Sequence, residues 1–331
     1  MLLSDLGERE IIRRYIEPLL STNLGNIVGD DCAVLNLNDN SYLFSTDQGP
    51  SRTFIELLGI GTPADIAHFH VTINVSDIAA MGGEPIAILL VFAAKPDDTE
   101  EYVESYFYGI RQALNEYDIG LIGGDTKQSS LHSTTITIVG RSSTSGPLLR
   151  RGSQIGDQIF ITGELVGGTL RSYILAARSQ SSGSAISTSI DRPKAKVAFG
   201  KSLAMSGIST ACMDMSDGLL ATAVQLADIN NVTFRIIPDT IPCARPPDPA
   251  QEERWTNLIL NVGGDFGLMF TTRPSNAAQA ERMGARRIGE VVRGDGNPID
   301  RVALDRSAIR LRTWEQFRTV DSISNEIRSL V

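Results

Sequence analysis

The spacing of hydrophobic and polar positions divides the chain into alternating helices and strands. Asp5 with Glu8 resembles a capping box that opens the first helix, and Gly82-Gly83 is typical of a helix end. The expected helices span residues 6–20, 63–81, 99–117, 194–206 and 219–230. The expected strands span residues 27–35, 41–46, 86–93, 134–139, 159–162, 233–237, 268–271, 287–291 and 308–311. This alternation predicts a mixed α/β fold.

The length of 331 residues favours two domains. We expect an N-terminal α/β domain over residues 1–145 and a C-terminal α/β domain over residues 146–331. The serine-rich segment 179–189 is predicted to be a loop that joins elements of the second domain.

One face of the expected helix 63–81 carries polar side chains. His70, Asn74 and Asp77 follow each other at i, i+4 and i+7, so they share that face. Asp77 lies in the middle of the helix, where no cap is needed. His70 is interpreted in two ways, as a group that touches substrate or metal, or as a buried polar side chain with a backbone partner.

Composition and charge narrow the class of protein. The net charge of −9 disfavours nucleic acid as a partner, because a phosphate backbone requires a basic surface. The longest strongly apolar run, residues 86–94, is too short to span a bilayer, so no membrane association is expected. Three widely spaced cysteines without a CxxC pair are typical of a reducing compartment, and the start of the chain lacks a signal sequence. We therefore expect a cytoplasmic protein.

Short acidic motifs carry the strongest indication of chemistry. Each places a carboxylate beside glycine, serine or threonine, where backbone N–H groups are accessible. Carboxylates that hold Mg²⁺ next to free amides bind a polyphosphate, whereas carboxylates alone repel one. The six motifs are Gly29-Asp30-Asp31, Ser45-Thr46-Asp47, Asn74-Val75-Ser76-Asp77, Gly123-Gly124-Asp125-Thr126, Asp214-Met215-Ser216-Asp217-Gly218 and Gly263-Gly264-Asp265.

These motifs predict an enzyme that uses ATP and Mg²⁺ to transfer a phosphoryl group. Any single motif is more often a helix cap or a turn, and it is the set of six that favours a metal cluster. No GxxxxGK[ST] sequence is present, which disfavours the P-loop folds. The metal ligands expected from the residues alone are Asp30, Asp47, Asp77, Asp125 and Asp214, with oxygens from Ser45 and Thr46.

The same motifs resemble the thiamine-monophosphate kinase family, within the aminoimidazole-ribonucleotide-synthetase-like superfamily. The segments that carry the resemblance are Val28-Gly29-Asp30-Asp31-Cys32-Ala33-Val34-Leu35, Ser45-Thr46-Asp47, Asn74-Val75-Ser76-Asp77-Ile78-Ala79-Ala80-Met81-Gly82, Leu121-Ile122-Gly123-Gly124-Asp125-Thr126 and Met215-Ser216-Asp217-Gly218-Leu219. They occur in the family's order between about Asp5 and Thr272.

The resemblance implies a two-domain α/β (α+β) fold. In it, the N-terminal half pairs with a second subunit to form a barrel, so a homodimer is expected, and the C-terminal half has a ferredoxin-like core. The implied metal ligands are Asp30, Ser45, Thr46, Asp47, Asp77, Asp125, Asp214 and Asp217. The implied ATP contacts are Gly124, Asp125, Arg150 and Ser216. The candidate catalytic residues are Asp30, Asp47, Asp125 and Asp217.

The chain departs from the family where the acceptor substrate is expected to bind. A family histidine is absent from the stretch 48–54, and the family's lysine eight residues before Asp77 is Phe69. A family glutamate is missing after Gly263-Gly264, so the acceptor pocket is altered. The candidate acceptor contacts are Arg52, Lys127, Asp265 and Trp314.

Three functions remain open on this reasoning. The first is a Mg²⁺-dependent ATP phosphotransferase resembling thiamine-monophosphate kinase, acting on a small acceptor that can differ from thiamine monophosphate. The second is a ligase or cyclase that activates an amide or carboxyl oxygen as a phosphate and forms a C–N bond. The third is a nucleotide-binding paralogue without catalysis, although clustered carboxylates without metal cost stability through repulsion.

Overall fold

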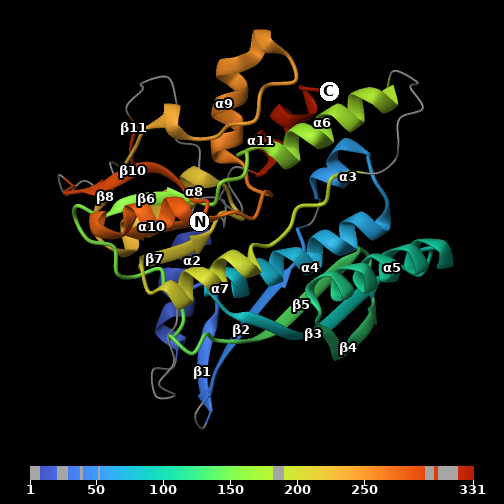
Figure 1. Ribbon diagram of the computed structural model, residues 1–331. Helices are drawn as coiled ribbons and strands as arrows, with labels where there is room; N and C mark the ends of the chain where they lie inside the picture. Colours follow the sequence, from blue (N-terminus) through green and yellow to red (C-terminus); the bar gives the residue numbers. More distant parts are fainter. Residues whose placement is uncertain are drawn as a thin grey trace.

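Two β-sheets with helices packed against them form the molecule (Figure 1). The computed structural model describes residues 8–20, 29–37, 40–50, 53–181, 190–294, 302–304 and 320–331. The mixed α/β class with two sheets is confirmed. No helix in this described part is both long and apolar enough to cross a lipid bilayer.

The first sheet has the strand order β1-β2-β5-β3-β4. All its pairings are antiparallel except that of β3 with β4, which is parallel. The strands are β1 (Ala33–Leu37), β2 (Asn40–Gln48), β3 (Glu84–Ala94), β4 (Gly120–Gln128) and β5 (Ser133–Arg141). The helices of this half are α2 (Glu8–Ile11, continued by two short helical turns to Leu19), α3 (Phe54–Leu58), α4 (Pro63–Ala80) and α5 (Glu100–Tyr117).

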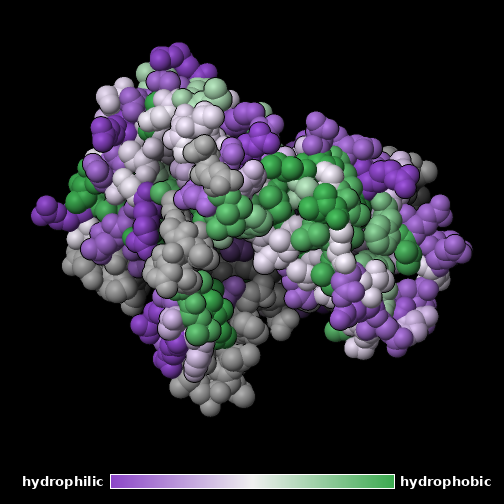
Figure 2. Space-filling model, turned by 90° about the horizontal axis from the view of Figure 1, so that it is seen from below, coloured by the Kyte–Doolittle hydropathy of each residue, from purple (hydrophilic) through white to green (hydrophobic). Residues whose placement is uncertain are grey.

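Only one face of this sheet is covered by helices. In Figure 1, α4 and α5 lie along one side of β2, β5 and β3, and no helix of the described residues lies on the other side. Along β5 the residues alternate between buried and half-buried, as expected of a sheet with one covered face. Every residue of β4 is exposed. The view from below in Figure 2 shows hydrophobic residues gathered on the right-hand side of the molecule. Leu89 and Val91 of β3 and Leu121 and Ile122 of β4 are exposed.

The second sheet has the strand order β11-β8-β10-β6-β9-β7. Its strands are β6 (Gln158–Ile161), β7 (Ser209–Asp214), β8 (Thr233–Ile236), β9 (Leu268–Thr272), β10 (Arg286–Val292) and β11 (Val302–Leu304). Its helices are α6 (Gly168–Ser181), α7 (Val197–Ser206), α8 (Leu219–Ile229), α9 (Glu252–Asn261), α10 (Ala277–Arg282) and α11 (Val320–Arg328). Strands β6 and β9 are buried at every position, so they form the centre of this layer.

Helix α4 packs against both halves of the molecule. It contacts β2, β3 and β5 of the first sheet, and also α7 and β7 of the second half. A capping box between Thr62 and Asp65 fixes its start, and Met81 ends it. Most of its side chains are buried, whereas Asp77 is half-buried.

Several predicted elements have different bounds in the structure. The strand expected from residue 27 begins only at Ala33, because 29–32 form a bend. The end of the segment expected as a loop, Ser179 to Ser181, is the last turn of α6. Strands β4 and β7 and helices α3, α6, α9, α10 and α11 were not expected. The strand predicted at 308–311 lies outside the described residues.

The contact between α7 and α4 generates a test of how the two halves are joined. Gly200 of α7 lies so close to α4 that a Cβ would be 2.0 Å from the Ala79 carbonyl oxygen. Helix propensity alone favours Gly200→Ala by about 1 kcal/mol. We expect the opposite, a loss of roughly 1–3 kcal/mol in the free energy of unfolding measured with urea, because the methyl group forces the helices apart.

The matched control is Ser202→Ala, at an exposed position of the same helix. We expect its effect to stay within about 0.5 kcal/mol. A stabilised Gly200→Ala protein contradicts the close approach of α7 and α4.

Candidate active site

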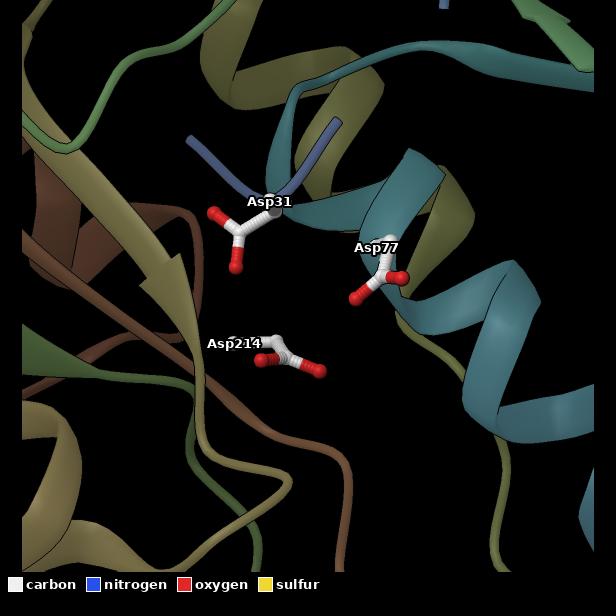
Figure 3. A group of neighbouring side chains, drawn as sticks. All are labelled: Asp31, Asp77 and Asp214. Atoms are coloured by element: carbon white, nitrogen blue, oxygen red, sulfur yellow. The ribbon is translucent and has the colours of Figure 1, made fainter. Parts of the chain in front are cut away.

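Three aspartates from distant parts of the chain meet between the two sheets (Figure 3). Asp31 lies in the bend before β1, Asp77 in the last part of α4 and Asp214 at the end of β7. One carboxylate oxygen of each lies within 4.8 Å of the others. Asp31 is 7% and Asp214 is 2% exposed. The three side chains in Figure 3 point toward a shared space, the arrangement that a divalent cation requires.

Hydroxyl groups fix the orientation of two of these carboxylates. Ser45 Oγ of β2 donates to Asp77 Oδ2 at 2.5 Å. Ser76 Oγ of α4 donates to Asp214 Oδ2 at 2.7 Å, and Ser216 Oγ donates to Asp214 Oδ1 at 3.0 Å. Each donor comes from one of the acidic motifs, so the motifs supply the supporting groups as well as the carboxylates.

Arg150 connects this group to the bend that carries Asp30 and Asp31. Its Nη2 donates to Asp31 Oδ1 at 2.8 Å, and its backbone N–H donates to Asp30 Oδ1. Burial opposes a charged guanidinium, but the charge of Asp31 and the hydrogen bond to it raise the pKa of Arg150 above its usual value. Asp30 therefore anchors the backbone at Arg150, while Asp31 faces the other two aspartates.

Buried polar atoms without protein partners lie at this site. Asp31 Oδ2 and Arg150 Nε are buried and have no hydrogen-bond partner among the described residues. A buried oxygen of this kind is costly unless a ligand satisfies it. Carboxylate and hydroxyl oxygens are the ligands that Mg²⁺ prefers. The residues present therefore fit a divalent cation held by Asp31, Asp77 and Asp214.

The electrostatics of the group also favour a cation. Burial, followed by the charges of Asp214 and Asp47, raises the pKa of Asp77 well above its usual value. Burial and the charge of Asp31 raise the pKa of Asp214 to about 7. Burial likewise raises the pKa of Asp47. Without a cation, the folded protein must keep protons on some of these acids or accept their mutual repulsion.

A cavity of about 390 Å³ opens next to the three aspartates. Ser45, Asp47, Ser216 and Asp217 line it together with the aspartates and Arg150. The rest of its wall is both polar and apolar, and the polar residues there are Glu8, Gln48, Thr53 and Gln225. The apolar lining residues are Pro50, Phe54, Phe69, Ile73, Met213 and Phe266.

Phe69 occupies the place of the family's lysine and packs against Phe266. The two ring centroids are 5.3 Å apart with an interplanar angle of 58°. Phe69, Ile73 and Asp77 follow each other every four residues on α4, so they lie on one face of the helix. Phe69 is about 12 Å along the axis from Asp77, at roughly 1.5 Å per residue. The cavity thus has a carboxylate end and an aromatic end.

Not all predicted site residues join this group within one chain. Thr46 bonds to Ile136 O and Thr137 Oγ1, and strand alternation points it away from Ser45 and Asp47. Gly124 and Asp125 lie on exposed β4, three strands from β2 and so roughly 14 Å away. Asp125 instead contacts Lys127 Nζ at 3.4 Å.

Three of the candidate acceptor contacts lie away from the cavity or outside the described residues. Asp265 accepts hydrogen bonds from Gly167 N and Thr169 N at 2.6 and 2.9 Å, so it caps the start of α6. It does not line the cavity beside the aspartates. Arg52 and Trp314 lie outside the described residues.

Sequence reasoning missed Asp31, which takes the place expected for Asp30. The two adjacent aspartates are equivalent as a motif, and only the bend decides which one faces inward. Alternation from the buried Cys32 and Val34 gives no signal for Asp31, since the strand starts only at Ala33. The motif identified the position to within one residue.

The chain is similar to known proteins over most of its length. Residues 29–142 match the model of the family described as AIR synthase related protein, N-terminal domain. The chain is 31% identical over 286 residues to the thiamine-monophosphate kinase of Salmonella typhimurium, covering 82% of this chain and 84% of that protein.

Solved structures show the same fold. The structure of AaThiL complexed with AMPPCP and TMP has a TM-score of 0.74 at 23% identity, covering 96% of this chain and 99% of that one. The HypE–HypF complex contains a chain with a TM-score of 0.68 at 16% identity, covering 91% and 99%. At these identities the likeness concerns the fold.

The raised pKa values generate a prediction about pH and magnesium. The folded protein holds protons on Asp77 and Asp214 more tightly than the unfolded chain does. Their contribution to stability is therefore complete below pH about 4 and is lost as pH rises through about 7. Magnesium binds the deprotonated form, so we expect its affinity, measured by calorimetry, to rise by about tenfold per pH unit for each proton released below that range.

Two variants on α4 separate this effect from general destabilisation. Asp77→Asn keeps an acceptor for Ser45 but removes a charge, so we expect loss of the magnesium-induced shift in thermal unfolding. Asp65→Asn removes another buried carboxylate of α4, one that pairs with Arg192 at 2.8 Å. It should lower the unfolding temperature and keep the magnesium response. An unchanged response in Asp77→Asn contradicts the cation site.

Proposed function

The chain belongs to the thiamine-monophosphate kinase family of ATP-dependent kinases, and from that premise we propose a Mg²⁺-dependent phosphoryl transfer from ATP to a small acceptor that differs from thiamine monophosphate. The single observation that carries the reaction is the convergence of Asp31, Asp77 and Asp214 beside an open cavity. A change of acceptor is supported by the aromatic end of that cavity, where Phe69 packs on Phe266.

ATP and magnesium are supported by chemistry and by a structural neighbour. Phosphoryl transfer depends on positioning and charge neutralisation rather than on covalent catalysis by the protein. A bound divalent cation supplies the positive charge that neutralises the phosphate oxygens. AaThiL, which shares the fold, is complexed with AMPPCP, an analogue of ATP.

The residues of this chain have separate tasks in the proposal. Asp31, Asp77 and Asp214 hold the cation, and Asp47 lines the same cavity next to Asp77. Ser216 and Asp217 precede helix α8, whose first turn presents backbone N–H groups that favour an anion. Arg150 keeps Asp31 in place and carries an N–H, at Nε, that a phosphate oxygen can accept.

The acceptor is proposed to occupy the space between the carboxylate end and the aromatic end. A lysine at position 69 would place a positive charge at that end, whereas Phe69 offers only an apolar ring. Among the described lining residues, Arg150 is the one cation, and it is paired with Asp31. An anionic group far from the cation site is therefore disfavoured in the acceptor.

A homodimer is the proposed assembly. Strand β4 is exposed along its whole length, and Leu121 and Ile122 on it are apolar. An exposed edge strand with such residues is a surface that natural proteins cover. Pairing of two such sheets would bring Gly124 and Asp125 of one subunit toward a partner, which gives these two residues a place in nucleotide binding that they lack in one chain.

The acceptor proposal is tested with a screen for ADP formation from Mg-ATP over small acceptors, thiamine monophosphate included. We expect one acceptor to stimulate ADP release, to carry the transferred phosphate as product, and to exceed thiamine monophosphate in kcat/KM by about 100-fold or more. Phe69→Lys should shrink that difference, because it returns a charge to the aromatic end of the cavity.

Other results of the screen identify the alternatives. Free phosphate together with a new C–N bond indicates a ligase. Binding of Mg-ATP without turnover of any acceptor indicates a nucleotide-binding paralogue. Efficient use of thiamine monophosphate by the wild-type chain contradicts the changed acceptor and leaves the kinase reaction intact.

The dimer is tested by light scattering after gel filtration. We expect twice the chain mass of 35.8 kDa for the wild type and a single-chain mass for Ile122→Asp, because a charge in an apolar strand interface is costly. Ile155→Asp, at another exposed isoleucine in the turn before β6, is the control and should remain dimeric. A wild-type mass of one chain excludes this assembly.

A further inference from the structure

The inward-facing residues of β2 contact α4 at regular intervals. Ser45 bonds to Asp77, and the backbone N–H of Asp47 donates to Asn74 Oδ1 at 3.3 Å. Gly49, the next residue with the same orientation, lies against the ring of His70. Every second residue of β2 thus meets the next turn of α4. The third of these contacts involves no aspartate and has no role in the proposed reaction.

His70 and Gly49 are in close contact because Gly49 has no side chain. A Cβ on Gly49 would lie 2.5 Å from His70 Nε2 and 2.7 Å from Cδ2 and Cε1. The φ angle of Gly49 is not in the left-handed region, so its backbone conformation is open to any residue. The ring of His70 alone therefore excludes a side chain at position 49.

The ring of His70 is held from the opposite side. His70 Nδ1 lies 2.8 Å from the hydroxyl of Tyr106 on α5, and that hydroxyl donates to Thr134 Oγ1 at 2.7 Å. The Thr134 carbonyl in turn accepts from Gly49 N–H at 2.8 Å. Gly49, Thr134, Tyr106 and His70 form a closed ring of contacts. Every member is held by two others.

The protonation of His70 follows from these contacts. Because Tyr106 donates to Thr134, its oxygen accepts from Nδ1–H, which leaves Nε2 as an unprotonated atom facing Gly49. Nε2 is buried and has no hydrogen-bond partner among the described residues. Burial lowers the pKa of His70 to about 4, so the imidazole is neutral. A neutral ring in van der Waals contact with a glycine acts as a spacer.

Gly49 stands between two residues that line the cavity, Gln48 and Pro50. We propose that His70 is a positioning residue: its ring sets the place of Gly49 and thereby holds the Gln48–Pro50 segment at the wall of the acceptor cavity. The proposal rests on the proposed function only in naming that cavity as the acceptor's. Gly49 and His70 are then a matched pair, and neither can change alone.

The test is a double-mutant cycle of Gly49→Ala and His70→Ala. Each single variant should speed hydrogen exchange of the amide at position 49 by about tenfold or more, because the bond to Thr134 O is loosened. The double variant should return to within about threefold of the wild type, because the new methyl group occupies the space that the ring has left. The affinity for Mg-AMPPCP, measured by calorimetry, should stay within about threefold in all variants.

Steady-state rates with Mg-ATP and thiamine monophosphate add a kinetic readout. We expect KM for thiamine monophosphate to rise by about tenfold in each single variant and to recover in the double variant, with kcat changed much less. Lack of turnover by the wild type with every acceptor of the screen counts against the proposed function, whereas hydrogen exchange still decides the role of His70. The two failures are therefore distinguishable.

The control is His68→Ala, which removes another buried histidine of α4. His68 bonds to Glu116 at 2.9 Å rather than facing β2. It should lower stability and leave the amide at position 49 protected. If His70→Ala does not fold, His70→Asn takes its place in the cycle, since it keeps a donor toward Tyr106. Additive effects of the two substitutions, or an unchanged amide in the His70 variant, overturn the proposal.

Discussion

Repulsion between buried carboxylates is the constraint on which the rest of the structure depends. Three aspartates from separate segments converge, and a fourth, Asp47, lies beside Asp77. Such a group is unstable by itself and becomes favourable only with protons or a cation. The surrounding elements accordingly supply hydroxyl donors and one arginine, yet leave a carboxylate oxygen unsatisfied. A protein that tolerates this arrangement is organised for a ligand, which agrees with its membership of a family of ATP-dependent kinases.

The contact between β2 and α4 connects the cation site with the acceptor end of the cavity. One strand contributes Ser45, Asp47 and Gly49 in turn, and one helix face meets them with Asp77, Asn74 and His70. The same helix continues to Phe69, whose ring packs on Phe266. The distance between the two ends of the cavity is therefore determined by the rise of a single helix. A change in the acceptor requires different side chains along this face of α4 rather than a different fold.

The sequence was sufficient to predict the helices and strands whose local signals agree with their environment. Helices α4 and α5 have caps and long apolar patterns, and their bounds were predicted closely. Strand β4 was missed because glycines and exposed residues give it no alternation, and its partner strand β3 alone determines its conformation. Helix α6 was missed because its start is fixed by Asp265, which lies about a hundred positions later in the chain. The motifs contain Asp77 and Asp214, which the structure brings together, whereas the placement of Asp31 rather than Asp30 beside them depends on a bend that no periodicity encodes.

Helix α4 belongs to the interior of both halves, with α5 and the first sheet on one side and α7 and β7 on the other. Its apolar side chains fill the core of the first half, and Ala80 packs in a cluster with Phe160 and Leu203 of the second half. We therefore expect the two halves to unfold together, even though each has its own sheet. Opening of one half exposes apolar surface of the other, so a hinge between them of the kind found in many two-lobed enzymes is costly.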